Sequence, residues 1–381
     1  QAGGRVLALS TLGSLVGTFA TTYYLVPSLG LRWTFALAGG LLALAGGLLA
    51  WERARGKALA GMLGLWGVAG LIPFPVASPG VGERWLAQVE SPYQWIRVVE
   101  VGEGATLERR MVVNEAFDSY QSLWRPSPGL LGPGSYYDYF ASPAHWDPKP
   151  GPWRVLVLGL GAGTAVRVLE GALPEGMQLE STGVEIDPDV VRLGQEFFDL
   201  ERNDTDRRVF AGQDARQVLR RLPNDFDQII LDAYANNVEI PPHLCTLEFF
   251  REVRGHLRDG GWVTANLSGF GLEDPVIQAV SRTLASAMEA PVWVAQLPFS
   301  RNAMVYARRG GELPDPSQAG FADVENRELV ARLQGIRLPG TSRTLAPDDA
   351  AVLTDDACPI LTLERASIER GALGWLQQVA P

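Results

Sequence analysis

The stretch WRVLVLGLGAGTAVRVLEGAL, residues 153–173, places an apolar run directly before three closely spaced glycines and a second, helix-like run. The apolar run predicts a strand, and the residues after the glycines predict a helix. Glycines at positions 159, 161 and 163 let the backbone turn sharply and come close to a ligand at the N-terminus of that helix. A G-x-G-x-G pattern is weak evidence alone, and its position between a strand and a helix strengthens it.

Strand and helix patterns alternate from this stretch onward, which predicts a parallel sheet with helices on both faces. A further helix near 274–289 and strands near 291–297 and 303–308 complete the pattern, whereas 310–350 reads as rich in loops. The expected strands are 153–160, 178–187, 207–214, 226–234 and 260–268, and the expected helices between them are 163–173, 188–200, 215–222 and 247–257.

Acidic residues stand where the second, third and fourth of these strands end. Glu185 lies 22 residues after Gly163, where a carboxylate can accept hydrogen bonds from both hydroxyls of a ribose. Asp214 could accept from an adenine amino group, and Asp232 ends the fourth strand. Open α/β sheets bind ligands at this carboxyl edge. Each acid could instead only cap a helix, an alternative that stays open for Asp214 and Asp232 individually, but four features in register favour a ligand site.

The spacing lacks the third glycine of the dinucleotide fingerprint, and the pattern resembles the class I S-adenosylmethionine-binding fold. The order of the motifs further resembles the spermidine synthase family of aminopropyltransferases, especially its bacterial members fused to membrane segments. The resemblance covers nearly the whole chain. It implies an α/β, Rossmann-like transferase domain with a small N-terminal β region, preceded by transmembrane helices. The phrases typical of the subgroup are STLGSLVGTF (10–19), YYDYF (136–140), IPPHLCTLEFF (240–250) and LTDDACPILTL (353–363).

The resemblance also implies roles for individual residues. By it, Asp232 takes a proton from the attacking amine, and Tyr136 or Tyr137 lies near the polyamine. Decarboxylated S-adenosylmethionine, or S-adenosylmethionine itself, is the implied co-substrate, an amine is the acceptor, the assembly is a homodimer and no metal is needed. The residues matched to nucleoside binding are Gln94, Gly159, Gly161, Gly163, Glu185 and Asp214.

The chemistry gives Asp232 a physical task. An amine must be neutral to attack the carbon beside a sulfonium, yet it is cationic at pH 7, so a neighbouring carboxylate that accepts its proton promotes the reaction. Members of the resembled family carry a second aspartate three residues later, where this chain has Ala235. That departure leaves the polyamine substrate open. Glu239 could substitute as a substrate-binding carboxylate or be a solvated loop residue, and His243 could be a base or structural.

Three uncharged apolar runs, 6–26, 33–51 and 58–76, precede the catalytic pattern. Each is close to the roughly 20 residues that cross a bilayer as a helix, so they predict about three transmembrane helices in the bacterial inner membrane. Arg53, Arg55 and Lys57 place the second joint in the cytoplasm by the positive-inside rule, which puts 77–381 outside if the third run crosses. The supply of the nucleoside favours the cytoplasmic face instead. A third run that does not span, a failure of the charge rule and an extracytoplasmic domain all remain open.

The net charge and the number of cysteines limit which ligands and cross-links the chain can have. Five of the 33 basic and one of the 43 acidic residues lie in 1–76, so 77–381 carries about −14, which argues against nucleic acid and permits a cationic substrate. Two cysteines, Cys245 and Cys358, make neither a metal site nor a disulfide framework. Both sit in motifs near the carboxyl edge of the sheet, so they could approach each other.

We therefore expect five segments and weigh three functions. The leading function is a membrane-anchored aminopropyltransferase. The alternatives are a methyltransferase that uses S-adenosylmethionine and a non-catalytic module that senses a nucleoside or polyamine. The segments are 1–76 (transmembrane), 77–122 (β-hairpin domain), 123–150 (connecting loop), 151–310 (catalytic domain) and 311–381 (C-terminal extension).

Overall fold

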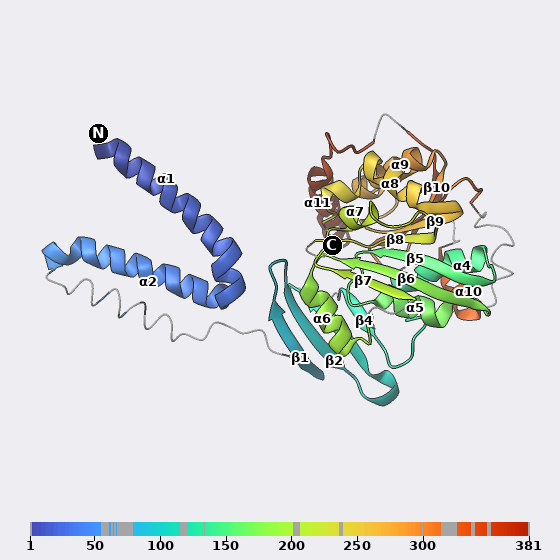
Figure 1. Ribbon diagram of the computed structural model, residues 1–381, viewed down its shortest axis with the longest axis horizontal. Helices are drawn as coiled ribbons and strands as arrows, with labels where there is room; N and C mark the ends of the chain where they lie inside the picture. The colour runs from blue at the N-terminus through green and yellow to red at the C-terminus, as the bar shows by residue number, and fades with distance from the viewer. Residues whose placement is uncertain are drawn as a thin grey trace. The chain divides into compact units, whose positions relative to one another are not determined.

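The chain forms two compact units, one made of 1–84 with 88–96 and the other of 85–87 with 97–381 (Figure 1). The segment boundaries expected from the sequence stay predictions. The computed structural model describes residues 2–54, 61, 64, 66, 79–114, 120–132, 134–200, 206–235, 239–298, 300–313, 326–336, 340–348 and 352–379.

Two long helices form the N-terminal part of the first unit. Helix α1 (Ala2–Ala20) continues through the π-helical turn η1 (Thr21–Leu25) into α2 (Val26–Ala54), whose geometry is broken at Gly30 with φ 76°. Among the described residues one helix, Gly3–Leu25, is long and apolar enough to cross a membrane, and the apolar helix Trp33–Leu48 is shorter. The third expected span, 58–76, lies almost entirely outside the described residues.

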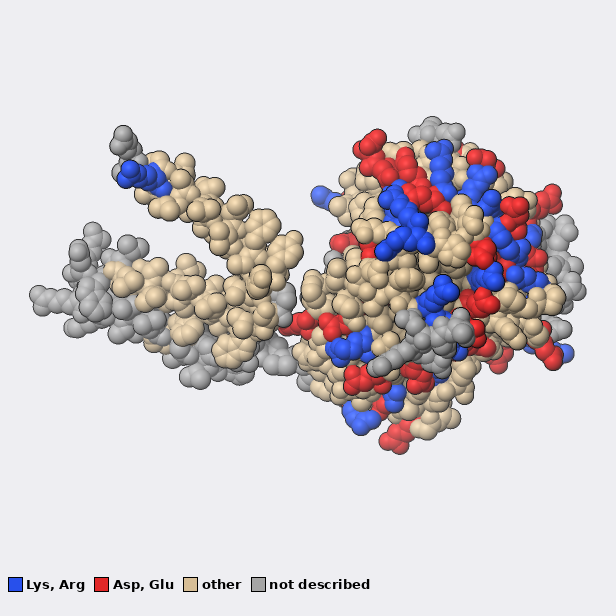
Figure 2. Space-filling view, in the orientation of Figure 1, with Lys and Arg blue, Asp and Glu red and all other residues tan. Residues whose placement is uncertain are grey.

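Apolar side chains along α1 and η1 are exposed. Val6, Leu9, Phe19 and Tyr23 are all more than half exposed. In Figure 2 the visible face of α1 carries one basic side chain near its start, whereas basic and acidic side chains alternate over the larger unit. An exposed apolar helix of this kind suits a lipid environment better than water.

Two sheets follow. The first has the order β1-β2-β3-β4 and includes the segment 77–122 in which the sequence predicts β structure. Its strands are β1 (Glu83–Glu90), β2 (Trp95–Val101), β3 (Glu108–Val113) and β4 (Ser122–Trp124). The 3-10 helix η3 (Tyr136–Ala141) and the following α4 (Ser142–Trp146) lie within 123–150, the segment expected to be a connecting loop.

The second sheet has eight strands in the order β12-β10-β11-β9-β8-β5-β6-β7. Strands β7, β6, β5, β8 and β9 form the parallel sheet that the alternation of strands and helices predicts, and β11, β10 and β12 are added antiparallel, so the complete sheet is mixed. The connection from β10 to β11 is too short for a crossover, and a short connection permits only antiparallel pairing. The strands are β5 (Gly151–Leu158), β6 (Met177–Glu185), β7 (Arg207–Ala211), β8 (Phe226–Leu231), β9 (Leu257–Ser268), β10 (Val292–Gln296), β11 (Asn302–Arg308) and β12 (Ser342–Leu345).

Helices cover both faces of this sheet, and each face has its own apolar core (Figure 1). The period-two alternation of β5 divides its side chains between them: Leu156 and Leu158 pack with α7, α8 and α9, whereas Val155 and Val157 pack with η3, α5 and α10. The stretch 310–350 is less loop-rich than expected, since it contains α10 and β12. The helices are α5 (Thr164–Ala172), α6 (Pro188–Phe197), α7 (Ala215–Leu219), α8 (Leu247–His256), α9 (Pro275–Met288), α10 (Arg327–Gly335) and α11 (Ile360–Val379).

The order of the strands determines where a ligand site can form. Strand β5 lies between β6 and β8, and Leu158 is paired with Val184 on one side and Leu231 on the other. The chain runs outward from β5 in both directions, so its carboxyl end is the switch point at which such sheets bind ligands. Glu185 and Asp232 therefore flank the glycine turn that follows β5.

Candidate active site

The glycine turn is built by backbone conformations that only glycine adopts readily. Gly159, Gly161 and Gly163 have φ angles of 89°, 56° and 92°. The N–H of Gly159 donates to the Val184 carbonyl at 3.0 Å, which ties the turn to β6. A Cβ on Gly159 would lie 2.4 Å from the backbone oxygen of Asp232, so the turn also contacts the chain leaving β8 directly.

Gly159→Ala should therefore destabilise the protein more than positive φ alone would. Gly176→Ala is the matched control, because Gly176 has φ 82° but no atom within 4 Å of the point where a Cβ would lie. We expect the control to cost about 1 kcal/mol and Gly159→Ala about 2 kcal/mol more, since backbone atoms must shift. Chemical denaturation of both variants measures the difference. Equal losses would show that the close approach to Asp232 has no energetic weight.

Glu185 holds the glycine turn in place. Its Oε2 accepts from the Gly161 N–H at 2.9 Å, and its Oε1 accepts from the Asp187 N–H at 3.1 Å. The side chain is buried, and burial raises the pKa of this carboxyl, against the two backbone hydrogen bonds that lower it. Each carboxylate oxygen has a second lone pair, so both can still accept from a ligand hydroxyl.

Asp232 follows β8 directly and is half-buried. Its Oδ1 accepts from the Asn266 amide at 2.9 Å, and its Oδ2 accepts from the Tyr136 hydroxyl at 3.0 Å. Burial raises the pKa of Asp232 to about 7, the two hydrogen bonds oppose this rise, and the charge of Glu185 adds to it. A carboxyl with a pKa near 7 can exchange protons readily at neutral pH, which is what a general base requires.

Asp214 is held by two contacts. Its Oδ1 accepts from the Gln217 N–H at 2.9 Å and so caps α7, and its Oδ2 lies 2.7 Å from Nε2 of His243. The cap is the structural alternative that the sequence left open for this residue. Adenine binding by Asp214 stays a prediction, as does a role for His243 as a base.

A family model for the spermine/spermidine synthase domain matches residues 142–312, the range that contains the glycine turn, Glu185, Asp214 and Asp232. This part of the chain is therefore similar to the spermine/spermidine synthase domain. Over 303 residues it is 28% identical to a probable polyamine aminopropyl transferase of Bifidobacterium longum, covering 74% of this chain and 62% of that protein. Over 122 residues it is 36% identical to a polyamine aminopropyltransferase of Vibrio vulnificus, covering 31% and 38% of the two chains.

The chain thus spans less than two thirds of the length of these curated relatives. Among solved structures, it is similar to the crystal structure of a probable spermidine synthase from Corynebacterium glutamicum, with 22% identity and a TM-score of 0.54. That likeness covers 71% of this chain and 91% of the other, and it supports the fold: an α/β domain of the class I S-adenosylmethionine-dependent type.

The two adjacent tyrosines, Tyr136 and Tyr137, form hydrogen bonds with different partners. Tyr136 bonds Asp232, whereas the hydroxyl of Tyr137 donates to the Gln121 carbonyl, and the two rings stack with centroids 4.1 Å apart. Burial raises the pKa of both hydroxyls, so both stay protonated donors at neutral pH. The substrate-binding role of Tyr137 stays a prediction, and Tyr136 is the tyrosine that touches the candidate base.

Two other sequence candidates, Glu239 and Gln94, form local backbone hydrogen bonds. Glu239 and Ala235 exchange backbone hydrogen bonds of 2.9 and 2.7 Å across the loop after β8, and residues 236–238 between them lie outside the described residues. Gln94 belongs to the other compact unit, where its carbonyl accepts from the Ser91 N–H at 2.9 Å. Substrate binding by Glu239 and nucleoside binding by Gln94 stay predictions. Within the described ranges, no cluster of three or more His, Cys, Asp or Glu residues could hold a metal ion.

Asn266 is the site residue that the sequence analysis missed. It lies in β9 and is only 4% exposed. While its amide donates to Asp232, its Oδ1 accepts from the Asn302 amide of β11 at 2.8 Å. The chain of bonds from Asn302 through Asn266 orients the carboxyl of Asp232. An asparagine within the apolar strand GGWVTANLS was the available signal.

Asn266→Ala should raise the pKa of Asp232 further, because it removes a donor that stabilises the charged form. A hydrogen bond to a charged group is worth about 1.5 kcal/mol or more, so we expect the acidic limb of the pH–rate profile to move up by about one pH unit. Asn302→Ala is the control, because Asn302 contacts Asn266 and not Asp232, and it should shift the profile less. Profiles that coincide for all three proteins would contradict the assignment.

Proposed function

We propose that this chain is a transferase that moves an aminopropyl group from decarboxylated S-adenosylmethionine to an amine. The observation that carries the proposal is the half-buried Asp232 beside the glycine turn, with a pKa raised to about 7. Glu185, on the other side of the same turn, offers two carboxylate oxygens for ribose hydroxyls. The match of residues 142–312 to the spermine/spermidine synthase domain supports the same function.

The chemistry assigns each group one task. The amine gives a proton to the carboxylate of Asp232, and its nitrogen lone pair attacks the carbon beside the sulfonium. The bond between carbon and sulfur breaks, and sulfur keeps the electron pair as a neutral thioether, so no acid is needed for its departure. Tyr136 and Asn266 hold the Asp232 oxygens by hydrogen bonds, which keep the carboxyl oriented while it changes charge.

The donor decides between aminopropyl transfer and methyl transfer. We expect the full chain, incubated with putrescine and decarboxylated S-adenosylmethionine, to give an aminopropylated amine and a neutral thioether nucleoside. With S-adenosylmethionine we expect no methylated amine. Methylation would favour the methyltransferase alternative, and binding of either donor without any product would favour a sensing module. Mass spectrometry of the products separates the three outcomes.

The sequence says less about the amine acceptor than about the nucleoside donor. Ala235 is exposed at the position where members of the resembled family carry a second aspartate. Ala235→Asp should lower the Michaelis constant for a diamine, because a second carboxylate attracts the distal ammonium. Ala235→Asn, with the same size but no charge, is the control. An unchanged constant in the aspartate variant would indicate that the acceptor is not a diamine or binds elsewhere.

We further propose that the N-terminal unit anchors the chain in the bacterial inner membrane, with the larger unit on the cytoplasmic face where the nucleoside is supplied. The support is the 23-residue apolar helix Gly3–Leu25, whose side chains are exposed. The full chain should partition with phospholipid vesicles, whereas a fragment beginning at Gly80 should stay in buffer. A full chain that is monodisperse without detergent would contradict the anchor, and protease protection in inverted vesicles tests the side.

A further inference from the structure

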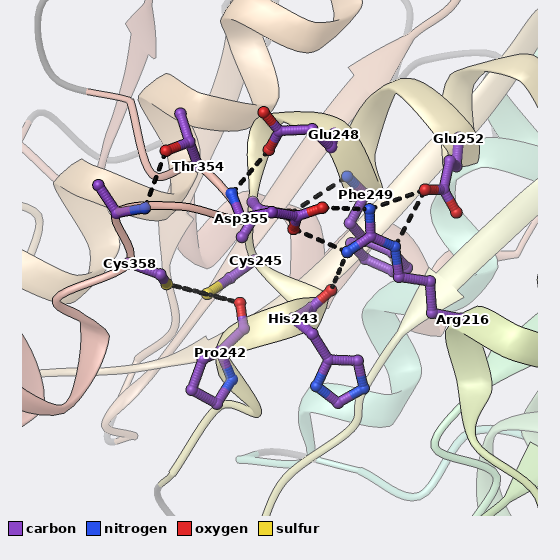
Figure 3. Close-up of polar contacts among 12 residues, drawn as sticks. Arg216, Pro242, His243, Cys245, Glu248, Phe249, Glu252, Thr354, Asp355 and Cys358 are labelled. Carbon is purple, nitrogen blue, oxygen red and sulfur yellow. Dashed lines mark hydrogen bonds and ion pairs between the residues drawn. The ribbon is translucent and has the colours of Figure 1, made fainter.

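The two cysteines lie side by side, Cys245 just before α8 and Cys358 just before α11. Sγ of Cys245 is 3.6 Å from Sγ of Cys358, although 113 positions separate them in the chain, and both are free thiols. Figure 3 shows both sulfurs next to the carbonyl of Pro242, which accepts from Cys245 at 3.3 Å and from Cys358 at 3.5 Å. They are the two cysteines of the whole sequence.

The segments that carry the thiols are held together by contacts that do not involve sulfur. Both terminal nitrogens of the Arg216 guanidinium donate to the Asp355 carboxylate, at 2.7 and 2.8 Å (Figure 3). Thr246 donates to the same carboxylate at 2.7 Å, and the Leu247 N–H donates to the Leu353 carbonyl at 2.7 Å. The segment 353–358 is therefore fixed against 246–247, and the thiols are held close before any bond joins them.

We propose that Cys245 and Cys358 form a disulfide that fastens the C-terminal segment to the loop after the strand of Asp232. A disulfide bond is about 2.0 Å long, so the sulfurs must approach by about 1.6 Å, a distance that side-chain rotation can supply when the two backbones are already adjacent. The anchored loop is the one that leads from Asp232 into α8, and its Ile240 N–H already donates to Glu364 of α11 at 2.7 Å.

Thiols are kept reduced in the cytoplasm, so at the cytoplasmic face proposed above the two cysteines rest as thiols. The bond forms only when an oxidant of the disulfide class, such as glutathione disulfide or an oxidised dithiol oxidoreductase, is supplied. The half-exposed Cys358 loses its proton first and attacks one sulfur of the oxidant, releasing one thiolate and leaving a mixed disulfide. Cys245, buried, then loses its proton and attacks Sγ of Cys358, releasing the second thiolate. The two cysteines lose two protons and two electrons in total, and the oxidant becomes two thiols. Burial raises the pKa of Cys245, which is consistent with its reacting second.

The cross-link should be visible as added stability. A loop of 113 positions is long, and closing long loops removes much of the conformational freedom of the unfolded chain. We expect the oxidised full chain to have a Tm about 5–10 °C above that of the reduced chain. Calorimetry in detergent, with and without dithiothreitol after incubation with glutathione disulfide, gives this number, and peptide mass spectrometry identifies the linked cysteines.

Cys358→Ser is the matched control, because it removes one sulfur from the half-exposed position and leaves Cys245 in place. The variant should show no dependence of Tm on dithiothreitol. Two alkylatable thiols after oxidation, or a stable glutathione adduct on Cys358 alone, would overturn the proposal. A cross-linked peptide without any rise in Tm would also overturn the proposal, because the disulfide would then not stabilise the fold. None of these results bears on aminopropyl transfer, which is measured separately.

Discussion

Asp232→Asn is expected to lower turnover about a hundredfold to ten-thousandfold while the affinity for the adenosyl donor stays nearly unchanged. Asparagine keeps the shape of the side chain and can still accept one hydrogen bond, but it cannot take a proton from the amine. Steady-state kinetics with decarboxylated S-adenosylmethionine gives the turnover, and calorimetry gives the donor affinity. If Asp232 only caps the turn after β8, turnover should change little, because asparagine caps about as well as aspartate.

The same variant has an opposite expected effect on stability. The pKa of Asp232 is raised from 3.8 to about 7 in the folded state, so folding favours its protonated form. The stability that this preference contributes is present below about pH 4 and is lost as the pH rises through 7. The asparagine side chain stays neutral throughout, so the variant should gain about 1–2 kcal/mol over the parent at pH 8 and nothing at pH 4. Lower stability at pH 8 would mean that the lost turnover reflects misfolding.

The ionised form of Asp232 lowers the stability of the fold, and the same carboxylate is the proposed proton acceptor. If Asp232 is the base of the proposed reaction, a cationic amine beside it would favour the ionised carboxylate, which is the form that can accept the proton. Tyr136 and Asn266 limit the cost, because each donates to one oxygen of Asp232. The site therefore combines a destabilised charge with two donors that keep it in the orientation for proton transfer.

The sequence predicted the half of the sheet that carries the candidate nucleoside site and missed how the sheet is completed. The switch from strand to helix at Gly159, and acids at 185 and 232, follow from periodicity along the chain, which is local information. The antiparallel addition of β11 next to β9 depends on pairing between segments far apart in the sequence. For that reason Asn266 could not be linked to Asn302, although their contact supports Asp232. The sequence analysis did not predict the short α10 and β12, because they lie in a stretch rich in loop residues.

Asp214 shows a second limit of sequence reasoning. An aspartate before a helix fits a cap and a ligand contact equally well, because both use a carboxylate oxygen at the same edge of the sheet. The structure shows the cap, in which Oδ1 accepts from Gln217, and it adds a contact to His243 that no spacing rule would predict. Pairing of Asp214 with His243 across 29 positions is again a long-range contact.

Glu185→Ala is expected to weaken binding of an adenosyl ligand by more than a hundredfold, about 3 kcal/mol or more. Two effects act together. The ligand loses a carboxylate that would accept from its ribose, and the buried N–H groups of Gly161 and Asp187 lose their acceptor, so the glycine turn is no longer held in its shape. Calorimetry with the adenosyl donor measures the affinity.

Glu185→Gln separates those two effects. Glutamine keeps one acceptor oxygen for the turn but places an N–H₂ group where the second oxygen accepts now, and it carries no charge. If Glu185 binds ribose, the glutamine variant should lose less Tm than the alanine variant, because it keeps one acceptor for the turn. It should still lose at least tenfold in affinity, because a charge-assisted bond is about twice as strong as a neutral one. If Glu185 only supports the turn, affinity should follow Tm in both variants. Parental affinity in the alanine variant would exclude Glu185 from the nucleoside site altogether, and would place the ribose on groups outside the edge that β5, β6 and β8 form.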